Sequence, residues 1–63
     1  MHVNFKFGPF EQVKIIADGL NYLGKIIRCE WDGQVKTYYC EYAADGKLEQ
    51  RAFFEEQLTH EFL

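Results

Sequence analysis

Apolar and β-branched residues gather in short runs along the chain, and turn-forming residues separate these runs. Val, Ile, Tyr and Phe favour strands, whereas Asp-Gly and Gly-Pro pairs mark turns. The pattern predicts strands at residues 12–16, 25–31, 35–42 and 47–54. Short strands at this spacing are typical of a small barrel or sandwich.

Two Asp-Gly pairs, at residues 32–33 and 45–46, predict hairpin turns because both residue types tolerate positive φ. A three-residue loop over 44–46 would set Tyr42 opposite Leu48, whereas a two-residue loop would shift the pairing by one residue. The first register is expected, and the second stays open. In the first, one face of the hairpin carries Tyr38, Cys40, Tyr42, Leu48, Gln50 and Phe54.

The last part of the chain has two interpretations. Residues 55–58 are expected to form one helical turn before a short strand over 59–62. The alternative is a single helix over 49–62, because Glu, Gln, Arg, Ala and Leu are good helix formers. The adjacent pair Phe53 and Phe54, and the need of the third strand for a hairpin partner, favour strand plus turn.

Composition limits the chain to one small domain. Its 63 residues can bury only about 60% of the unfolded surface, which leaves little room for a large catalytic cleft. Six Phe, four Tyr and one Trp oppose intrinsic disorder. Neither a Ser-His-Asp nor a Cys-His nor a paired-carboxylate arrangement has a supporting context, so no enzyme activity is predicted.

Cysteine and histidine positions indicate no metal and no cofactor. Cys29 and Cys40 form no CxxC pair, and His2 and His60 lie at opposite ends of the chain. The two cysteines are expected as small buried side chains, with a disulfide between neighbouring strands as the alternative. Without an apolar stretch long enough to span a bilayer or a secretory signal, a cytoplasmic location without membrane contact is expected.

The order of glycines and aromatic residues adds a resemblance that covers nearly the whole chain. It runs through Phe7-Gly8, Val13-Lys14-Ile15, Gly19, Gly24-Lys25-Ile26, Tyr38-Tyr39-Cys40-Glu41-Tyr42, Asp45-Gly46, Phe54-Glu55 and Leu58. This order resembles the small SH3-like barrels of the Tudor and KOW type. Two departures are Cys40, where Val is usual, and a longer spacing between Gly8 and Val13.

The resemblance implies an all-β fold, a single five-stranded SH3-like β-barrel with a short helical turn before the last strand. The barrel would occupy residues 10–63, and residues 1–9 would form an N-terminal arm. Because residues 3–7 alternate apolar and polar side chains, the arm can add a strand to its own barrel or to a neighbour. The chain is therefore expected as a monomer or as a homodimer through this arm.

The resemblance also implies binding rather than catalysis. Tudor-type barrels hold methylated Lys or Arg in an aromatic cage through cation–π attraction. The corresponding candidates for binding a protein or peptide partner are Tyr22, Trp31, Tyr39, Phe53 and Asp32, with Glu30 beside them. The structural alternative is that large aromatic side chains simply cover the open ends of a small barrel.

An alternative function is nucleic-acid binding by the first half of the chain. Residues 1–28 carry four basic and two acidic residues, whereas residues 29–63 carry three basic and eight acidic residues. Lys14, Lys25, Arg28 and Lys36 could contact phosphates while Tyr39 or Trp31 stacks on bases. The net charge of -3, and the alternation of Lys25 and Arg28 along an ideal strand, weaken this interpretation.

The acidic second half suggests a further kind of contact. Four carboxylates there could face a basic protein partner or serve solubility alone. They are Glu49, Glu55, Glu56 and Glu61.

Overall fold

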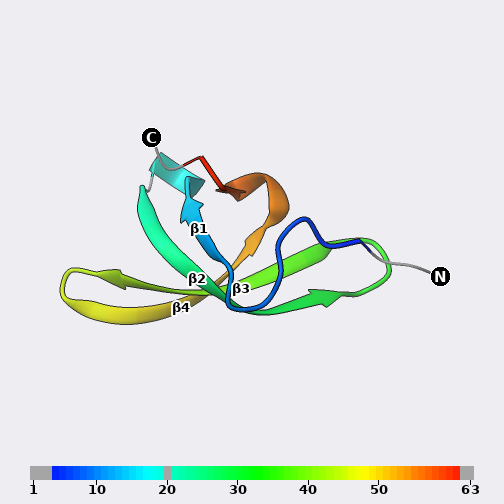
Figure 1. The fold of residues 1–63 in the computed structure, drawn as a ribbon, viewed down its shortest axis with the longest axis horizontal. Coiled ribbons are helices and arrows are strands. Elements are labelled where there is room, and N and C mark those ends of the chain that lie inside the picture. Colours follow the sequence, from blue (N-terminus) through cyan, green and yellow to red (C-terminus); the bar gives the residue numbers. More distant parts are fainter. Residues whose placement is uncertain (1–3, 20, 62–63) are drawn as a thin grey trace.

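The structure, a computed structural model, describes residues 4–19 and 21–61. Within these residues the regular elements are five strands and two 3-10 turns (Figure 1). The strands are β1 (Gln12–Ile15), β2 (Tyr22–Trp31), β3 (Lys36–Ala44), β4 (Lys47–Phe54) and β5 (Leu58–Thr59). The turns are η1 (Ala17–Gly19) and η2 (Glu55–Gln57).

The predicted all-β class is confirmed, and the predicted strands lie close to the observed ones. The helix considered over 49–62 is wrong, because β4 and η2 occupy most of that range. The last strand was expected over 59–62 but is β5, at Leu58–Thr59. Residue 62 lies outside the described residues.

The five strands form one antiparallel sheet in the order β4-β3-β2-β1-β5. The sheet twists and curls into a half-barrel, with η2 leading from β4 to β5 (Figure 1). As a result β1 lies between β2 and β5, and the two edge strands are β4 and β5.

The core fills the inner side of this curl. Its largest fully buried side chains are Tyr38, Phe7, Phe53, Ile15, Ile26 and Val13. Burying a side chain of this size contributes about 1.5–3 kcal/mol, so a handful of them can stabilise a domain of this length. Residues that alternate with them along β2 and β3 point to the outer face of the sheet.

The loop between β3 and β4 has two residues, Asp45 and Gly46. Both have positive φ, 53° and 78°, which is the geometry of a type I′ turn. The expected three-residue register is therefore wrong: Tyr42 lies opposite Glu49, and Ala44 lies opposite Lys47.

This one-residue shift changes which side chains of β4 point into the core. Phe53 lies opposite Tyr38 and is 2% exposed, whereas Phe54 and Leu48 are 48% and 71% exposed. Leu48, Gln50 and Phe54 therefore do not share the core face of Tyr38, as the three-residue register predicted.

A β-bulge interrupts the pairing of β2 with β3 between Ile26 and Arg28. Lys25 lies opposite Glu41 and Arg28 opposite Tyr39, and these two residues of β3 share the outer face. Lys25 and Arg28 thus lie on the same face, although an ideal strand would place them on opposite faces. The extra residue, Ile27, accounts for the difference.

The N-terminal arm packs onto the open side of the barrel. Phe7 is 1% exposed, and its ring meets the Tyr38 ring edge-on at 5.5 Å. The Lys6 amide donates a hydrogen bond to the Tyr38 hydroxyl at 3.0 Å. Residues 4–9, the described part of the arm, form bends and turns and no strand.

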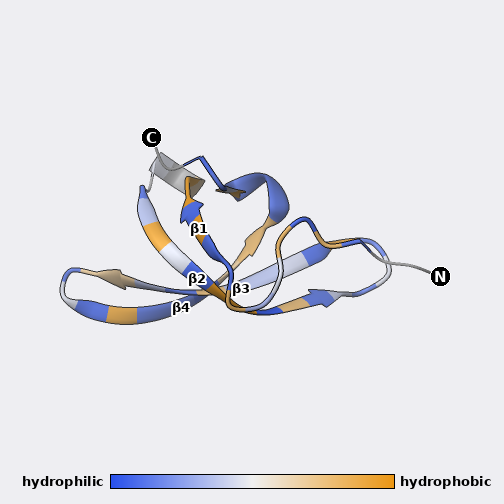
Figure 2. Cartoon of the chain, in the orientation of Figure 1, coloured by the Kyte–Doolittle hydropathy of each residue, from blue (hydrophilic) through white to orange (hydrophobic). Residues whose placement is uncertain are grey.

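The turn end of the β3–β4 hairpin extends away from the rest of the molecule (Figure 1). The whole molecule measures 40 × 23 × 21 Å along its principal axes. In β4 only Phe53 is buried, and the other seven residues are exposed. Most of this strand before its last two residues is hydrophilic (Figure 2).

Candidate functional site

The loop between β2 and β3 is closed by one carboxylate. Trp31 and Lys36 form the last pair of the two strands, so the loop has four residues, one more than the strands predicted over 25–31 and 35–42 leave between them. The Asp32 Oδ1 atom accepts hydrogen bonds from the amides of Gln34 at 3.0 Å and Val35 at 2.9 Å. These amides hold the pKa of the Asp32 carboxyl below its usual value.

A shallow pocket of about 510 Å³ lies beside this loop, on the strand residues that lead into it. Trp31, Asp32 and Tyr39, three of the five residues predicted to bind a partner, meet in it. Trp31 is 38% exposed, so its ring is accessible to a partner. The full lining is Glu30, Trp31, Asp32, Thr37 and Tyr39.

The ring of Tyr39 already holds a cation. The guanidinium of Arg28 lies 4.2 Å from the ring centroid, and it also pairs with Glu30 at 3.7 Å. A guanidinium stacked on an aromatic ring and paired with a carboxylate has both contacts that an arginine of a partner would need. Arg28 therefore shows how a basic side chain fits this surface.

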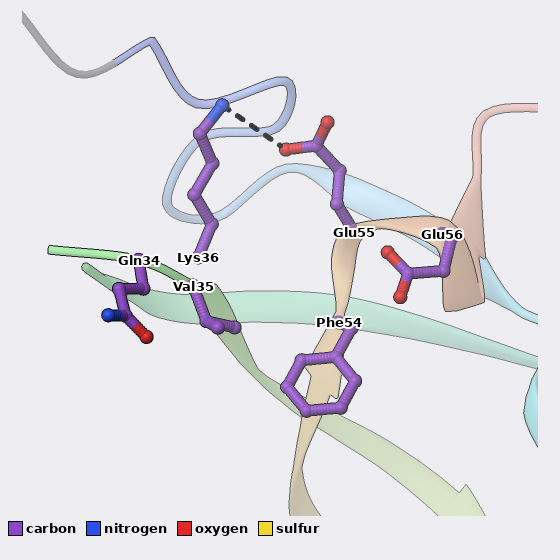
Figure 3. A pocket seen from close by; sticks show the side chains of 6 residues that line it. All are labelled: Gln34, Val35, Lys36, Phe54, Glu55 and Glu56. Atoms are coloured by element: carbon purple, nitrogen blue, oxygen red, sulfur yellow. Dashed lines mark ion pairs between the residues drawn. The ribbon is translucent and has the colours of Figure 1, made fainter. Parts of the chain in front are cut away.

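A second pocket, of about 420 Å³, lies where β3 begins and β4 ends (Figure 3). Its apolar part consists of Val35 and Phe54, which are 41% and 48% exposed. Its polar part includes the ion pair between Lys36 and Glu55, whose Nζ and Oε2 atoms lie 3.6 Å apart. The full lining is Gln34, Val35, Lys36, Phe54, Glu55 and Glu56.

A chain of hydrogen bonds fixes the position of Glu55. The Lys6 amide donates to the Tyr38 hydroxyl, and this hydroxyl donates to Glu55 Oε2 at 2.8 Å. Burial, together with the hydrogen bond to Glu55, raises the pKa of Tyr38 to about 12. Lys36 completes the network, because its ammonium group also contacts the carbonyl oxygen of Asn4.

The two pockets adjoin each other across the sheet. Phe54 of the second pocket pairs with Thr37 of the first, and Thr37 in turn pairs with Glu30 of β2. We call their combined lining the β2–β3 surface. It carries four carboxylates, one ammonium group and four exposed or half-buried apolar side chains, which are Trp31, Val35, Tyr39 and Phe54.

The remaining two predicted partner-binding residues lie elsewhere. Tyr22, at the far end of β2, stacks on Tyr42 with 5.4 Å between ring centroids. Phe53, which a partner could reach only if it faced outward, belongs to the core, so its prediction as an accessible aromatic residue is wrong. Sequence reasoning missed Val35 and Phe54 as exposed members of the surface, because either phenylalanine of the pair 53–54 could have been the buried one.

The four basic residues proposed for nucleic-acid contact do not form one group. Lys14, Lys25 and Arg28 share the outer face of β1 and β2, with Glu41 opposite Lys25. Lys36 instead pairs with Glu55 and contacts the arm.

Neither cysteine forms a disulfide. Burial raises the pKa of the Cys40 thiol to about 11 and also raises the pKa of Cys29, to which the nearby Glu11 charge contributes. In the described part of the chain, no three His, Cys, Asp or Glu residues lie close enough to hold a metal ion. No helix among those residues is long and apolar enough to cross a membrane.

Comparison with protein-family models, with curated proteins and with solved structures finds no match to this chain.

Proposed function

We propose that this chain is a small non-catalytic interaction module that binds a basic segment of a protein or peptide at the β2–β3 surface. The observation that carries the proposal is the meeting of exposed apolar side chains with four carboxylates around one loop. An arginine or lysine of the partner would bring an aliphatic stem for Val35 and Phe54 and a charge for the carboxylates.

Two features of the surface support a cationic partner. Asp32 and Glu56 form no ion pair with another residue in ranges 4–19 and 21–61, whereas Glu30 and Glu55 do. The stacking of Arg28 on Tyr39 supports cation–π recognition, since an incoming guanidinium or methylated ammonium group would either displace Arg28 from this ring or use the exposed ring of Trp31 in the same pocket.

The fold supports the same proposal at a coarser level. The five-stranded sheet, with a 3-10 turn before the last strand, agrees with the SH3-like barrel that the sequence resembles. Because fold alone does not determine function, the proposal depends on the β2–β3 surface.

A titration with short fluorescent peptides tests the proposal. Peptides that contain arginine or trimethyllysine should bind in low salt, and a glutamate-containing peptide should not. Trp31→Ala should weaken binding about tenfold, because it removes an aromatic contact worth about 1.4 kcal/mol. Leu23→Ala is the matched control, since Leu23 is exposed at the far end of β2. Equal affinities for the Trp31→Ala and wild-type proteins would contradict the proposal.

Nucleic-acid binding is a second candidate, and the β-bulge is the observation in its favour. The bulge brings Lys25 and Arg28 to one face together with Lys14. Single-stranded and duplex oligonucleotides, added to the same titration at low salt, separate the two candidates. Binding that Lys25→Glu abolishes and Trp31→Ala leaves unchanged would favour nucleic acid.

A further inference from the structure

We propose that the free edge of β4 pairs with the same edge of a second copy of this chain and forms a symmetric dimer. In the dimer the two sheets would join into one, with the two β4 strands antiparallel at the centre. This interface is separate from the N-terminal arm. It is also separate from the β2–β3 surface, except at Phe54, the last residue of the strand.

The edge of β4 is long and uncovered. Within the described residues β4 pairs with β3 alone, and seven of its eight residues are exposed. An edge strand presents a row of unpaired amide and carbonyl groups that can pair with another chain. Proline and bulges, which commonly block such an edge, are absent from β4.

Charge selects a second copy as the partner. In a twofold antiparallel pair, residues i and j lie opposite each other when their sum is constant, and the pairs that exchange hydrogen bonds must consist of residues whose backbone groups point away from β3. Two registers pair seven residues of β4. One is centred on Arg51 and sets Arg51 against its own copy; the other is centred on Gln50 and sets Glu49 against Arg51 of the second copy, twice.

The register centred on Gln50 also pairs apolar side chains. It places Leu48 opposite Ala52 of the second copy on the outer face, and Leu48 is 71% exposed in the single chain. Neither Glu49 nor Arg51 forms an ion pair among the described residues, although Arg51 lies over the Phe53 ring at 5.2 Å. Both side chains are therefore available for cross-strand pairs.

Charge reversal tests the proposal through the association constant measured by sedimentation equilibrium. Wild-type protein should dimerise below about millimolar concentration, in the weak range that small interfaces give. Glu49→Arg and Arg51→Glu should each weaken the dimer at least about tenfold, because like charges then face each other twice. The double variant Glu49→Arg with Arg51→Glu restores unlike pairs and should return close to wild-type association.

Two controls keep the result specific. Glu61→Arg makes the same charge change at an exposed residue outside β4 and should leave association unchanged. Circular dichroism of every variant shows whether it folds, and amide exchange should slow in β4 as the wild-type concentration rises. A monomeric wild type at about millimolar concentration would overturn the proposal, as would a double variant as weak as the single variants. Dimerisation without concentration-dependent protection in β4 would also overturn it.

Discussion

The two ends of the β3–β4 hairpin have the same strands and the same alternation but different surroundings. At the barrel end, Tyr38 and Phe53 face each other inside the core and are almost completely buried. At the turn end, β4 continues on the same inner side with Lys47, Glu49 and Arg51, all of which are exposed. The difference teaches that alternation determines the face of a side chain, whereas the chemistry of that side chain indicates whether the face is covered.

The largest expected effect separates the two ends by one truncation at each. Phe53→Ala should lower the free energy of unfolding by about 3–5 kcal/mol, because it leaves a cavity in the core. Leu48→Ala, at the turn end, should change it by less than about 0.5 kcal/mol. Urea denaturation followed by circular dichroism at low protein concentration measures both. Similar losses for the two variants would mean that the turn end is covered in solution.

A smaller effect concerns the hydroxyl that anchors the barrel end. Tyr38→Phe removes hydrogen bonds to the Lys6 amide and to Glu55, and should cost about 1–2 kcal/mol at neutral pH. The pKa of Tyr38 is raised from 10.0 to about 12 in the folded chain, so its contribution is complete below pH 10 and is lost as pH rises toward 12.

Denaturation between pH 9 and 12 checks this sign. Wild-type stability should fall across the range, first through Cys40, whose pKa is raised from 9.0 to about 11, and then through Tyr38. Tyr38→Phe should flatten the upper part of the decline. An unchanged slope in that variant would show that the hydroxyl titrates alike in the folded and unfolded chains.

The smallest effect belongs to the turn itself. Gly46→Ala should cost about 1 kcal/mol of stability, because φ is 78° there and a residue with a Cβ atom is strained in that conformation. The cost should not be larger, since the added Cβ would meet no atom within 4 Å. The loss should be local, so that amides near residue 46 exchange faster while those of Tyr38 and Phe53 keep their protection. Uniform acceleration of exchange would mean that both ends of the hairpin open as one unit.

The sequence predicted the number, class and approximate bounds of the strands because their turns are marked by Gly and Asp. It misjudged the register, since an Asp-Gly pair suits both a two-residue loop and a three-residue loop. A shift of one residue was enough to exchange Phe53 with Phe54 between core and surface. The pair Ile26-Ile27 gave no sign of a bulge, because both residues are equally suited to a strand.

The candidate site was predicted in part for the same reasons. Trp31, Asp32 and Tyr39 were expected together, and the structure brings them into one pocket because they flank a single turn. Tyr22 could not be separated from them by residue type alone, and only the sheet places it against Tyr42. Glu55 and Glu56 were considered as general surface charge, since their position beside Val35 depends on long-range pairing.

The bulge at Ile27 makes chain length, as much as residue identity, a determinant of what this protein presents to solvent. If Ile27 were paired like its neighbours, uninterrupted pairing from Ile26 opposite Cys40 would bring Arg28 to the place that Cys29 now holds opposite Tyr38. A guanidinium would then point into the core, and the end of β2 would turn over. Deletion of Ile27 would instead leave a regular ladder with Arg28 still opposite Tyr39, so this position should tolerate the loss of one residue better than the paired positions of β2 on either side of it.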